Sequence, residues 1–148
     1  MEYQYYHTHP INKLIHFFCI PLIVITSANF ISKCRFFGIN IYGSCLISLL
    51  LNYYINYGFI TLAIMSIYYC IVDYYSEKWV RRKYWFFESC IIFTLAWILQ
   101  FIGHYIEGSR PALIDSISTA ISQAPLFSIM YLFEIIGYVF LKLTSMVQ

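Results

Sequence analysis

The chain has 148 residues, of which 61% are apolar and only 11% are charged, and its formal net charge is +2. A soluble domain has roughly 25% charged and about 45–50% apolar residues. These values exclude a disordered chain, a coiled coil and a nucleic-acid-binding protein, because each of these classes needs more charge. A domain of this size also has too much surface to hide so many apolar side chains from water. We therefore expect a single integral membrane domain over residues 1–148.

The first half of the chain contains three predicted apolar segments. The first covers residues 11–31 and ends at a basic break formed by Lys33 and Arg35. The apolar stretch over residues 39–75 measures roughly 55 Å as one helix, whereas the hydrocarbon core of a bilayer is about 30 Å thick. It is therefore expected to fold as two spans, with a turn near residues 52–58, where Asn and Gly interrupt the helical pattern.

The second half begins with a basic cluster at residues 77–83, followed by apolar segments over residues 85–104 and 126–142. Between these segments, residues 111–124 place apolar and polar side chains on opposite helical faces, which is typical of an amphipathic helix at the membrane interface. Pro111 is expected to begin this helix and Pro125 to end it. The predicted fold class is all-α: a polytopic membrane helix bundle with about five apolar segments plus one amphipathic interfacial helix.

The number of crossings predicts which ends of the segments meet. If all five segments cross, the two basic loops share one side, which the positive-inside rule makes cytoplasmic. The N-terminus and the end of the fourth segment then share the opposite side. A re-entrant first segment, or a re-entrant pair over residues 39–75, changes the sidedness.

All four histidines of the chain, His7, His9, His16 and His104, fall at those two ends. Neutral imidazole is the commonest nitrogen ligand for iron, zinc and copper. His9 and His16 are two helical turns apart, so on one helix they lie on the same face, about 10.5 Å apart along the axis. A histidine at a helix end is also commonly a satisfied polar group without a ligand. The convergence of all four on one side favours a shared metal site.

Two carboxylates follow His104 in the sequence. Glu107 lies three residues later, on the same face if the helix continues, and Asp115 lies on the polar face of the predicted interfacial helix. Either one can complete a two-histidine, one-carboxylate iron site or orient a ligand through a hydrogen bond. Each also has a structural interpretation, because Glu107 can pair with Arg110 and an acid in a first helical turn interacts favourably with the helix dipole.

Several chemistries lack their motifs in this chain. The sequence contains no G-x-S-x-G elbow, no P-loop and no G-x-G-x-x-G. Four histidines are too few for the several histidine boxes of the di-iron membrane desaturases. The five cysteines are scattered without a C-x-x-C pair, which predicts buried free thiols rather than a disulfide framework.

Two runs, YYHTHPINKLIHFFCIPL and WILQFIGHYIEGSRPALIDS, together with APLF at residues 124–127, resemble the Mpo-like membrane family over nearly the whole chain. The matching residues are His7 and Pro10 in H-x-x-P, Asn12 and His16 in N-x-x-x-H, Gly103 and His104 in Q-F-x-G-H, and Arg110, Pro111, Ala112, Leu113 and Asp115 in R-P-A-L-x-D. Two residues depart from the pattern. The family often has another residue at the position of His9, and Glu107 stands one position nearer to the histidine than the family's glutamate.

The resemblance implies an Fe(II)-dependent dioxygenase of 2-hydroxy fatty acids in the membrane of the endoplasmic reticulum. In this α-oxidation, O₂ attacks the 2-hydroxyacyl chain, C1 is lost and a fatty acid one carbon shorter results, as part of the breakdown of 2-hydroxy acids derived from phytosphingosine. The implied partners are the fatty acid, O₂ and the bilayer, and no nucleic acid. The oligomeric state stays open.

The expected site follows from this resemblance together with the histidine pattern. The catalytic residues are His7, His16 and His104, and the metal ligands are these three with His9. Glu107, Arg110 and Asp115 are expected to orient a ligand or contact the substrate. The alternative is a small non-catalytic membrane protein that binds lipid or metal. A conducting path is disfavoured, because the apolar segments contain few polar residues midway along their length.

Overall fold

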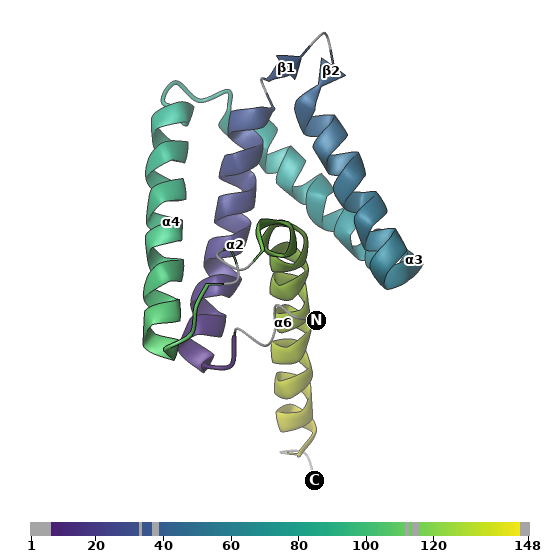
Figure 1. Ribbon diagram of the computed structural model, residues 1–148. Helices are drawn as coiled ribbons and strands as arrows, with labels where there is room; N and C mark the ends of the chain where they lie inside the picture. Colours follow the sequence, from purple (N-terminus) through teal and green to yellow (C-terminus); the bar gives the residue numbers. More distant parts are fainter. Residues whose placement is uncertain (1–6, 33, 37–38, 112, 114–115, 146–148) are drawn as a thin grey trace. The chain divides into compact units, whose positions relative to one another are not determined.

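The computed structural model describes residues 7–32, 34–36, 39–111, 113 and 116–145. These residues form four long helices and one two-stranded antiparallel ladder (Figure 1). The elements are α2 (Pro10–Ile31), β1 (Arg35–Phe36), β2 (Ile39–Asn40), α3 (Ile41–Trp79), α4 (Trp85–Glu107) and α6 (Ile117–Ser145). The helical class is confirmed, and the short ladder after α2 is a feature that hydropathy does not reveal.

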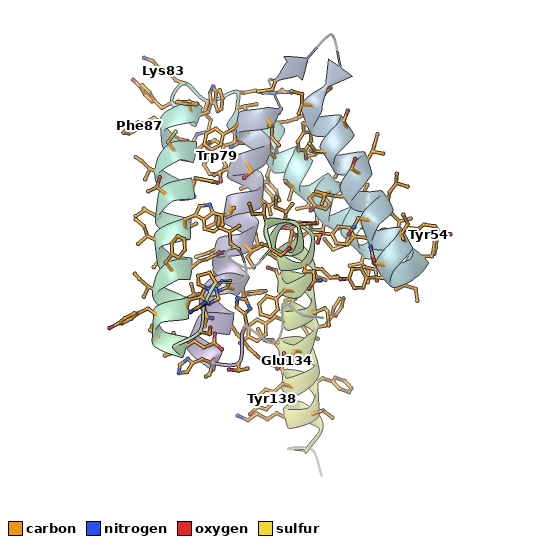
Figure 2. All side chains as sticks on the ribbon, in the orientation of Figure 1. Tyr54, Trp79, Lys83, Phe87, Glu134 and Tyr138 are labelled. Carbon is orange, nitrogen blue, oxygen red and sulfur yellow. The ribbon has the colours of Figure 1, made fainter. Side chains whose placement is uncertain are left out.

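Four helices of the described chain are long and apolar enough to cross a membrane, namely Pro10–Ile31, Ile41–Trp79, Trp85–Glu107 and Ala120–Lys142. The expected count of about five apolar segments plus a separate amphipathic helix is therefore not confirmed. Large apolar side chains on these helices point outward; Phe87 on α4 and Tyr54 on α3 are examples (Figure 2). An exterior of this composition suits contact with hydrocarbon rather than with water.

The five cysteines are free, as the sequence predicts. Only Cys19 is buried, however, whereas Cys34, Cys45 and Cys70 are exposed and Cys90 is half-buried. The prediction that these thiols are buried is thus wrong for most of them. The physical reason is that an apolar residue in a membrane-type helix can face outward at no cost, so an apolar neighbourhood in the sequence does not imply burial in the protein.

The chain divides into two compact units. The first unit comprises Met1–Ile20 and Gln100–Gln148, and the second comprises Pro21–Leu99. Helices α2 and α4 contribute one end to each unit. The organisation of residues 1–148 as a single membrane domain stays a prediction.

In the second unit, α3 bends back on itself at Gly58. This residue has φ 82° and ψ −176°, whereas the helix continues on both sides of it. The hydroxyl of Tyr42 donates a hydrogen bond to Asp73, and the ring centroids of Tyr53 and Tyr69 lie 6.5 Å apart, so the two arms of α3 lie against each other. A straight helix of 39 residues would extend about 58 Å, nearly twice the thickness of a bilayer core. The bend falls at the end of the range where the sequence predicts a turn.

A buried amide links three helices of the second unit. The Asn29 side chain on α2 donates from Nδ2 to Ser89 Oγ of α4 at 3.0 Å, and its Oδ1 accepts from Ser76 Oγ of α3 at 2.6 Å. All three side chains are buried. Because Asn29 uses both a donor and its acceptor, the cost of placing an amide among apolar helices is offset, and the three helix ends are held together.

In the first unit, Pro125 lies inside α6, so a separate interfacial helix that ends at this residue is not confirmed. Residues 117–124 are instead the first turns of α6, and in Figure 1 they are seen end-on while the rest of the helix is seen from the side. Pro125 lacks an N–H and therefore leaves the Ile121 carbonyl without its helical donor. Residues 125–128 are all buried, which indicates that packing holds the helix together where local preference would end it. Of the predicted start, residues 112, 114 and 115 lie outside the described residues.

We predict that Gly58→Ala lowers the free energy of unfolding by about 1–3 kcal/mol, because an L-residue is strained at this positive φ. The matched control is Gly137→Ala on α6, since an added Cβ meets nothing within 4 Å at either position and only Gly58 has a positive φ. The control should be neutral or stabilising by up to about 1 kcal/mol. Denaturant titration in detergent micelles, followed by circular dichroism, measures both. Equal effects of the two substitutions would contradict a role for the backbone of Gly58.

Candidate metal centre

Three histidines from distant parts of the chain meet inside the first unit. His7 precedes α2, His16 lies within α2 and His104 lies near the end of α4. The ring centroids are 4.2 Å apart for His7 and His16, 4.9 Å for His7 and His104, and 4.8 Å for His16 and His104. The three residues are only 1%, 1% and 5% exposed. The N-terminal end of the first segment and the end of the segment containing His104 therefore come together, as the topology predicts.

The three imidazoles fit a transition-metal ion. Each offers one nitrogen, and these three atoms lie within 4.8 Å of one another. With metal–imidazole bonds of about 2.1 Å, two ligand nitrogens of a tetrahedral ion lie about 3.4 Å apart. Two rings that each move by about 0.7 Å close a separation of 4.8 Å to this value, so the cluster can bind an ion after small ring movements. Iron, zinc, copper and nickel all accept imidazole, and three such ligands leave other coordination positions open.

Hydrogen bonds orient two of the rings. His16 Nδ1 lies 3.0 Å from the backbone oxygen of Asn12. Because a carbonyl oxygen only accepts, Nδ1 carries the proton and Nε2 keeps its lone pair. His104 Nδ1 lies 3.3 Å from Ser109 Oγ. In metal sites one ring nitrogen typically binds the ion while the other contacts the protein. In His16, Nδ1 makes such a protein contact, and Nε2 is the nitrogen that can bind an ion.

The carboxylate of Glu107 binds the beginning of α2. Its Oε1 accepts from Thr8 Oγ1 at 2.7 Å, from the His9 backbone N–H at 3.0 Å and from the Thr8 backbone N–H, while its Oε2 accepts from Asn12 Nδ2. N–H groups at the start of a helix have no intrahelical partner, so this carboxylate replaces the missing acceptor. Glu107 lies outside the cluster of three histidines. Its contacts therefore favour the orienting role over the ligand role and over an ion pair with Arg110.

The close approach of α2 and α4 depends on Gly103. A Cβ at this position would lie 2.2 Å from Asn12 Oδ1 and 3.5 Å from Ile15 Cδ1. No side chain fits at the first of these distances, so glycine is required wherever Asn12 keeps its bond to Glu107. The motif around Gly103 and His104 thus combines a packing requirement with a metal-ligand candidate.

Among the described residues, His9 and Arg110 do not belong to this cluster. His9 Nδ1 accepts from the Ile11 backbone N–H at 3.2 Å, a local contact at the helix start, and His9 is not part of the group of three histidines; its place in the ligand set stays a prediction. The helical spacing between His9 and His16 does not apply, because α2 begins at Pro10, after His9. Arg110 is exposed in the loop after α4, and Asp115 lies outside the described residues.

Aromatic side chains of α6 pack against one side of the cluster. The Phe127 ring centroid lies 5.0 Å from that of His7, and Phe127 stacks on Tyr131 at 6.2 Å. Lys13 lies 5.9 Å above the Tyr131 ring and its Nζ is 3.7 Å from Glu134, which is labelled on α6 in Figure 2. Phe127 was not among the predicted site residues, although the APLF run at residues 124–127 contained it.

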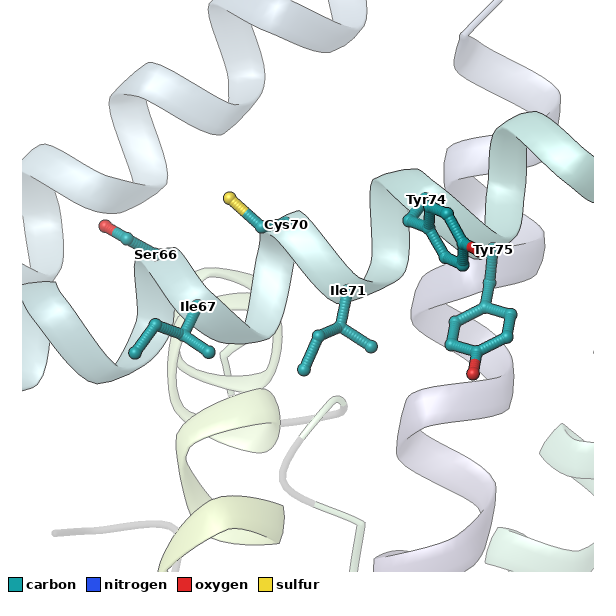
Figure 3. Close-up of a pocket in the computed structure, with 6 residues that line it drawn as sticks. All are labelled: Ser66, Ile67, Cys70, Ile71, Tyr74 and Tyr75. Atoms are coloured by element: carbon teal, nitrogen blue, oxygen red, sulfur yellow. The ribbon is translucent and has the colours of Figure 1, made fainter.

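A separate open groove lies along the second arm of α3, in the second unit. Its lining residues are Ser66, Ile67, Cys70, Ile71, Tyr74 and Tyr75 (Figure 3). All of them come from one run of a single helix, and none is a histidine. The groove is therefore distinct from the candidate metal centre, which belongs to the first unit.

We predict that His7→Ala, His16→Ala and His104→Ala each weaken Co²⁺ binding by more than about 100-fold, because a lost ligand costs more than the 10- to 100-fold typical of a lost supporting hydrogen bond. His9→Ala is the matched control and should bind Co²⁺ like the unmodified protein. Titration followed by the visible absorption of Co²⁺ measures the affinity. A loss in His9→Ala equal to that in His16→Ala would contradict the three-histidine cluster.

We predict that Glu107→Gln weakens Co²⁺ binding about 10- to 100-fold, because the amide turns an N–H donor towards groups that themselves donate. The substitution thereby weakens the link between α2, which carries His16, and α4, which carries His104. Glu134→Gln is the matched control, since this carboxylate is exposed on α6 and pairs only loosely with Lys13. The same titration compares both variants, and an unchanged affinity in Glu107→Gln would show that this carboxylate does not support the cluster.

Comparison with known proteins adds an independent finding. The family model described as "2-hydroxy-palmitic acid dioxygenase Mpo1-like" matches residues 1–136. The Saccharomyces cerevisiae protein named 2-hydroxy-palmitic acid dioxygenase MPO1 is 30% identical over 140 aligned residues, which cover 84% of this chain and 72% of the yeast protein. No solved structure matches the chain. The chain is therefore a member of the Mpo1-like family.

Proposed function

We propose that this protein is an Fe(II)-dependent dioxygenase that shortens 2-hydroxy fatty acids by one carbon. The observation that carries the proposal is the buried cluster of three imidazoles in an apolar helical chain whose family is named for a 2-hydroxy-palmitic acid dioxygenase. Several metals accept imidazole, and iron is the proposed one because non-haem Fe(II) sites with open coordination positions are typical of oxygenases.

The proposed reaction balances without an external reductant if C1 leaves as CO₂. The 2-hydroxy acid and one molecule of O₂ then give the shortened fatty acid, CO₂ and water. C2 is oxidised from the alcohol to the carboxyl level, C1 is oxidised from carboxyl to CO₂, and O₂ takes up all the electrons released. Loss of C1 as formate would leave an oxygen atom that needs an additional reductant.

The chain's own residues have distinct proposed roles. His7, His16 and His104 would hold the ion, which when bound supplies activation of O₂ and a binding position for substrate oxygens. Phe127 and the neighbouring buried residues of α6 exclude water from the cluster. Arg110, exposed just beyond α4, is proposed to pair with the fatty-acid carboxylate, because its planar guanidinium matches a carboxylate. Asp115 is kept as a further candidate for substrate contact.

The apolar exterior gives the acyl chain a place to lie. A long hydrocarbon tail dissolves in the bilayer, so an enzyme made of membrane-type helices meets its substrate there while the polar headgroup approaches the histidines. The proposed location in the endoplasmic reticulum, and the proposed place in the breakdown of phytosphingosine-derived acids, rest on the family resemblance alone.

We predict that purified protein loaded with Fe(II) consumes O₂ and 2-hydroxypalmitate in equal amounts and releases pentadecanoic acid and CO₂. Palmitate, which lacks the hydroxyl, should not be consumed. His16→Ala and His104→Ala should lower kcat/KM at least about 100-fold, because each removes a proposed ligand. An oxygen electrode and mass spectrometry of the products measure these quantities. Turnover that persists without iron, or in both variants, would reject the proposal, and binding without turnover would favour the non-catalytic alternative.

A further inference from the structure

Gln100 is a buried polar side chain one helical turn before His104 on α4. It is only 7% exposed, and its Nε2 is buried without a hydrogen-bond partner among the residues that the structure describes. A buried amide N–H that donates to nothing is unfavourable, and such groups in native proteins usually have a partner or a functional reason. In an apolar helix the cost is not relieved by surrounding water.

Helix geometry places Gln100 at the level of the histidines. Glu107 contacts Thr8, and the backbone of Gly103 lies against Asn12 and Ile15, so α4 and α2 run in opposite directions here. One turn further along each helix from these contacts lie Gln100 on α4 and His16 on α2.

Along α4, Gln100 shares a face with His104, because the two residues are four positions apart. Gln100 lies on the N-terminal side of His104, whereas Glu107 and Arg110 lie on its C-terminal side. The cluster thus has an uncommitted amide donor on one side. On its other side is Glu107, a carboxylate already engaged by Thr8, His9 and Asn12.

We propose that Gln100 Nε2 donates a hydrogen bond to an oxygen of the 2-hydroxy-carboxylate headgroup and holds it beside the histidines, an inference that rests on the proposed function. The headgroup supplies what the protein lacks at this point, which is an acceptor. A neutral amide is the suitable donor, since an ammonium or guanidinium group would be costly at this depth in an apolar chain. Phe127, which is buried in the same unit and contacts His7, offers no polar atom in its side chain.

If the bond is made to the 2-hydroxyl, Gln100 determines the choice between 2-hydroxylated and plain fatty acids. A site built to hydrogen-bond a substrate oxygen rejects an analogue that lacks the oxygen, because the buried protein group is then left unpaired. Comparison of 2-hydroxypalmitate with palmitate identifies the oxygen involved. A bond to the hydroxyl affects only the first ligand, and a bond to the carboxylate affects both.

The test compares Gln100→Met with the unmodified protein, because methionine has a similar length and no donor. The dissociation constant for 2-hydroxypalmitate, measured without O₂ on protein loaded with Co²⁺, is expected to rise about 10- to 100-fold, and kcat/KM of the iron-loaded enzyme should fall by a similar factor. Co²⁺ content and the thermal unfolding profile should not change. Gln123→Met is the matched control on α6, in the same unit, and should leave all four quantities as they are.

Each outcome decides one question. If the unmodified protein neither binds nor converts 2-hydroxypalmitate, the proposed function fails. If it does both and Gln100→Met behaves identically, only the role of Gln100 is overturned. Gln100→Glu, which keeps the shape and replaces the donor by an acceptor, provides the second variant should Gln100→Met not fold, and it is expected to bind 2-hydroxypalmitate at least as weakly. Loss of helical structure in both variants would assign Gln100 to the fold and also overturn the proposal.

Discussion

The bond between the end of α4 and the start of α2 is the interaction on which the candidate site depends. The N–H groups at the start of a helix have no acceptor within the helix, so an acceptor side chain placed there stabilises the helix start. The Glu107 carboxylate accepts from the two residues that follow His7 and from Asn12 one turn later. His104 lies three residues before Glu107 on the same helix. One carboxylate therefore joins the start of α2 to the end of the helix that carries His104.

Polar residues hold each unit together by the same physical principle. Apolar side chains gain little by leaving a hydrocarbon environment for one another, so packing of small residues and hydrogen bonds between helices take over the stabilising role. In the first unit Gly103 permits the approach that lets Asn12 reach Glu107. In the second unit Asn29 joins α2 to two serines on α3 and α4. The few polar residues of an apolar chain thus carry structural as well as chemical roles.

Local properties of the chain predicted much of the fold. The apolar segments over residues 11–31 and 85–104 correspond closely to α2 and α4, and the turn expected near residues 52–58 coincides with the bend at Gly58. A helix end was expected at Pro125 because proline locally disfavours a helix interior. The structure instead has Pro125 inside α6, where residues 125–128 are buried in the first unit. The ladder β1–β2 was missed, since two residues per strand leave no pattern in hydropathy.

The candidate site was predictable in part. The four histidines, at the start of the first apolar segment and the end of the fourth, indicated a shared site, and three of them meet in the structure. Spacing alone could not distinguish His9, which lies before α2 begins and contacts Ile11. Glu107 had three open interpretations, as a ligand, as an ion-pair partner and as an orienting group, and only its contacts with Thr8, His9 and Asn12 favour the last.

The sequence by itself determined the apolar helical class, the approximate extent of the long helices and the small set of residues capable of binding a metal. These follow from composition and periodicity, which are properties of neighbouring residues. The tertiary structure alone decided which three histidines meet, which carboxylate joins α4 to the start of α2, and that the Gln100 amide is buried without an acceptor among the described residues. The contacts between α2 and α4 join residues up to 99 positions apart in the chain, and they depend on the approach of the two helices at Gly103 rather than on any local pattern.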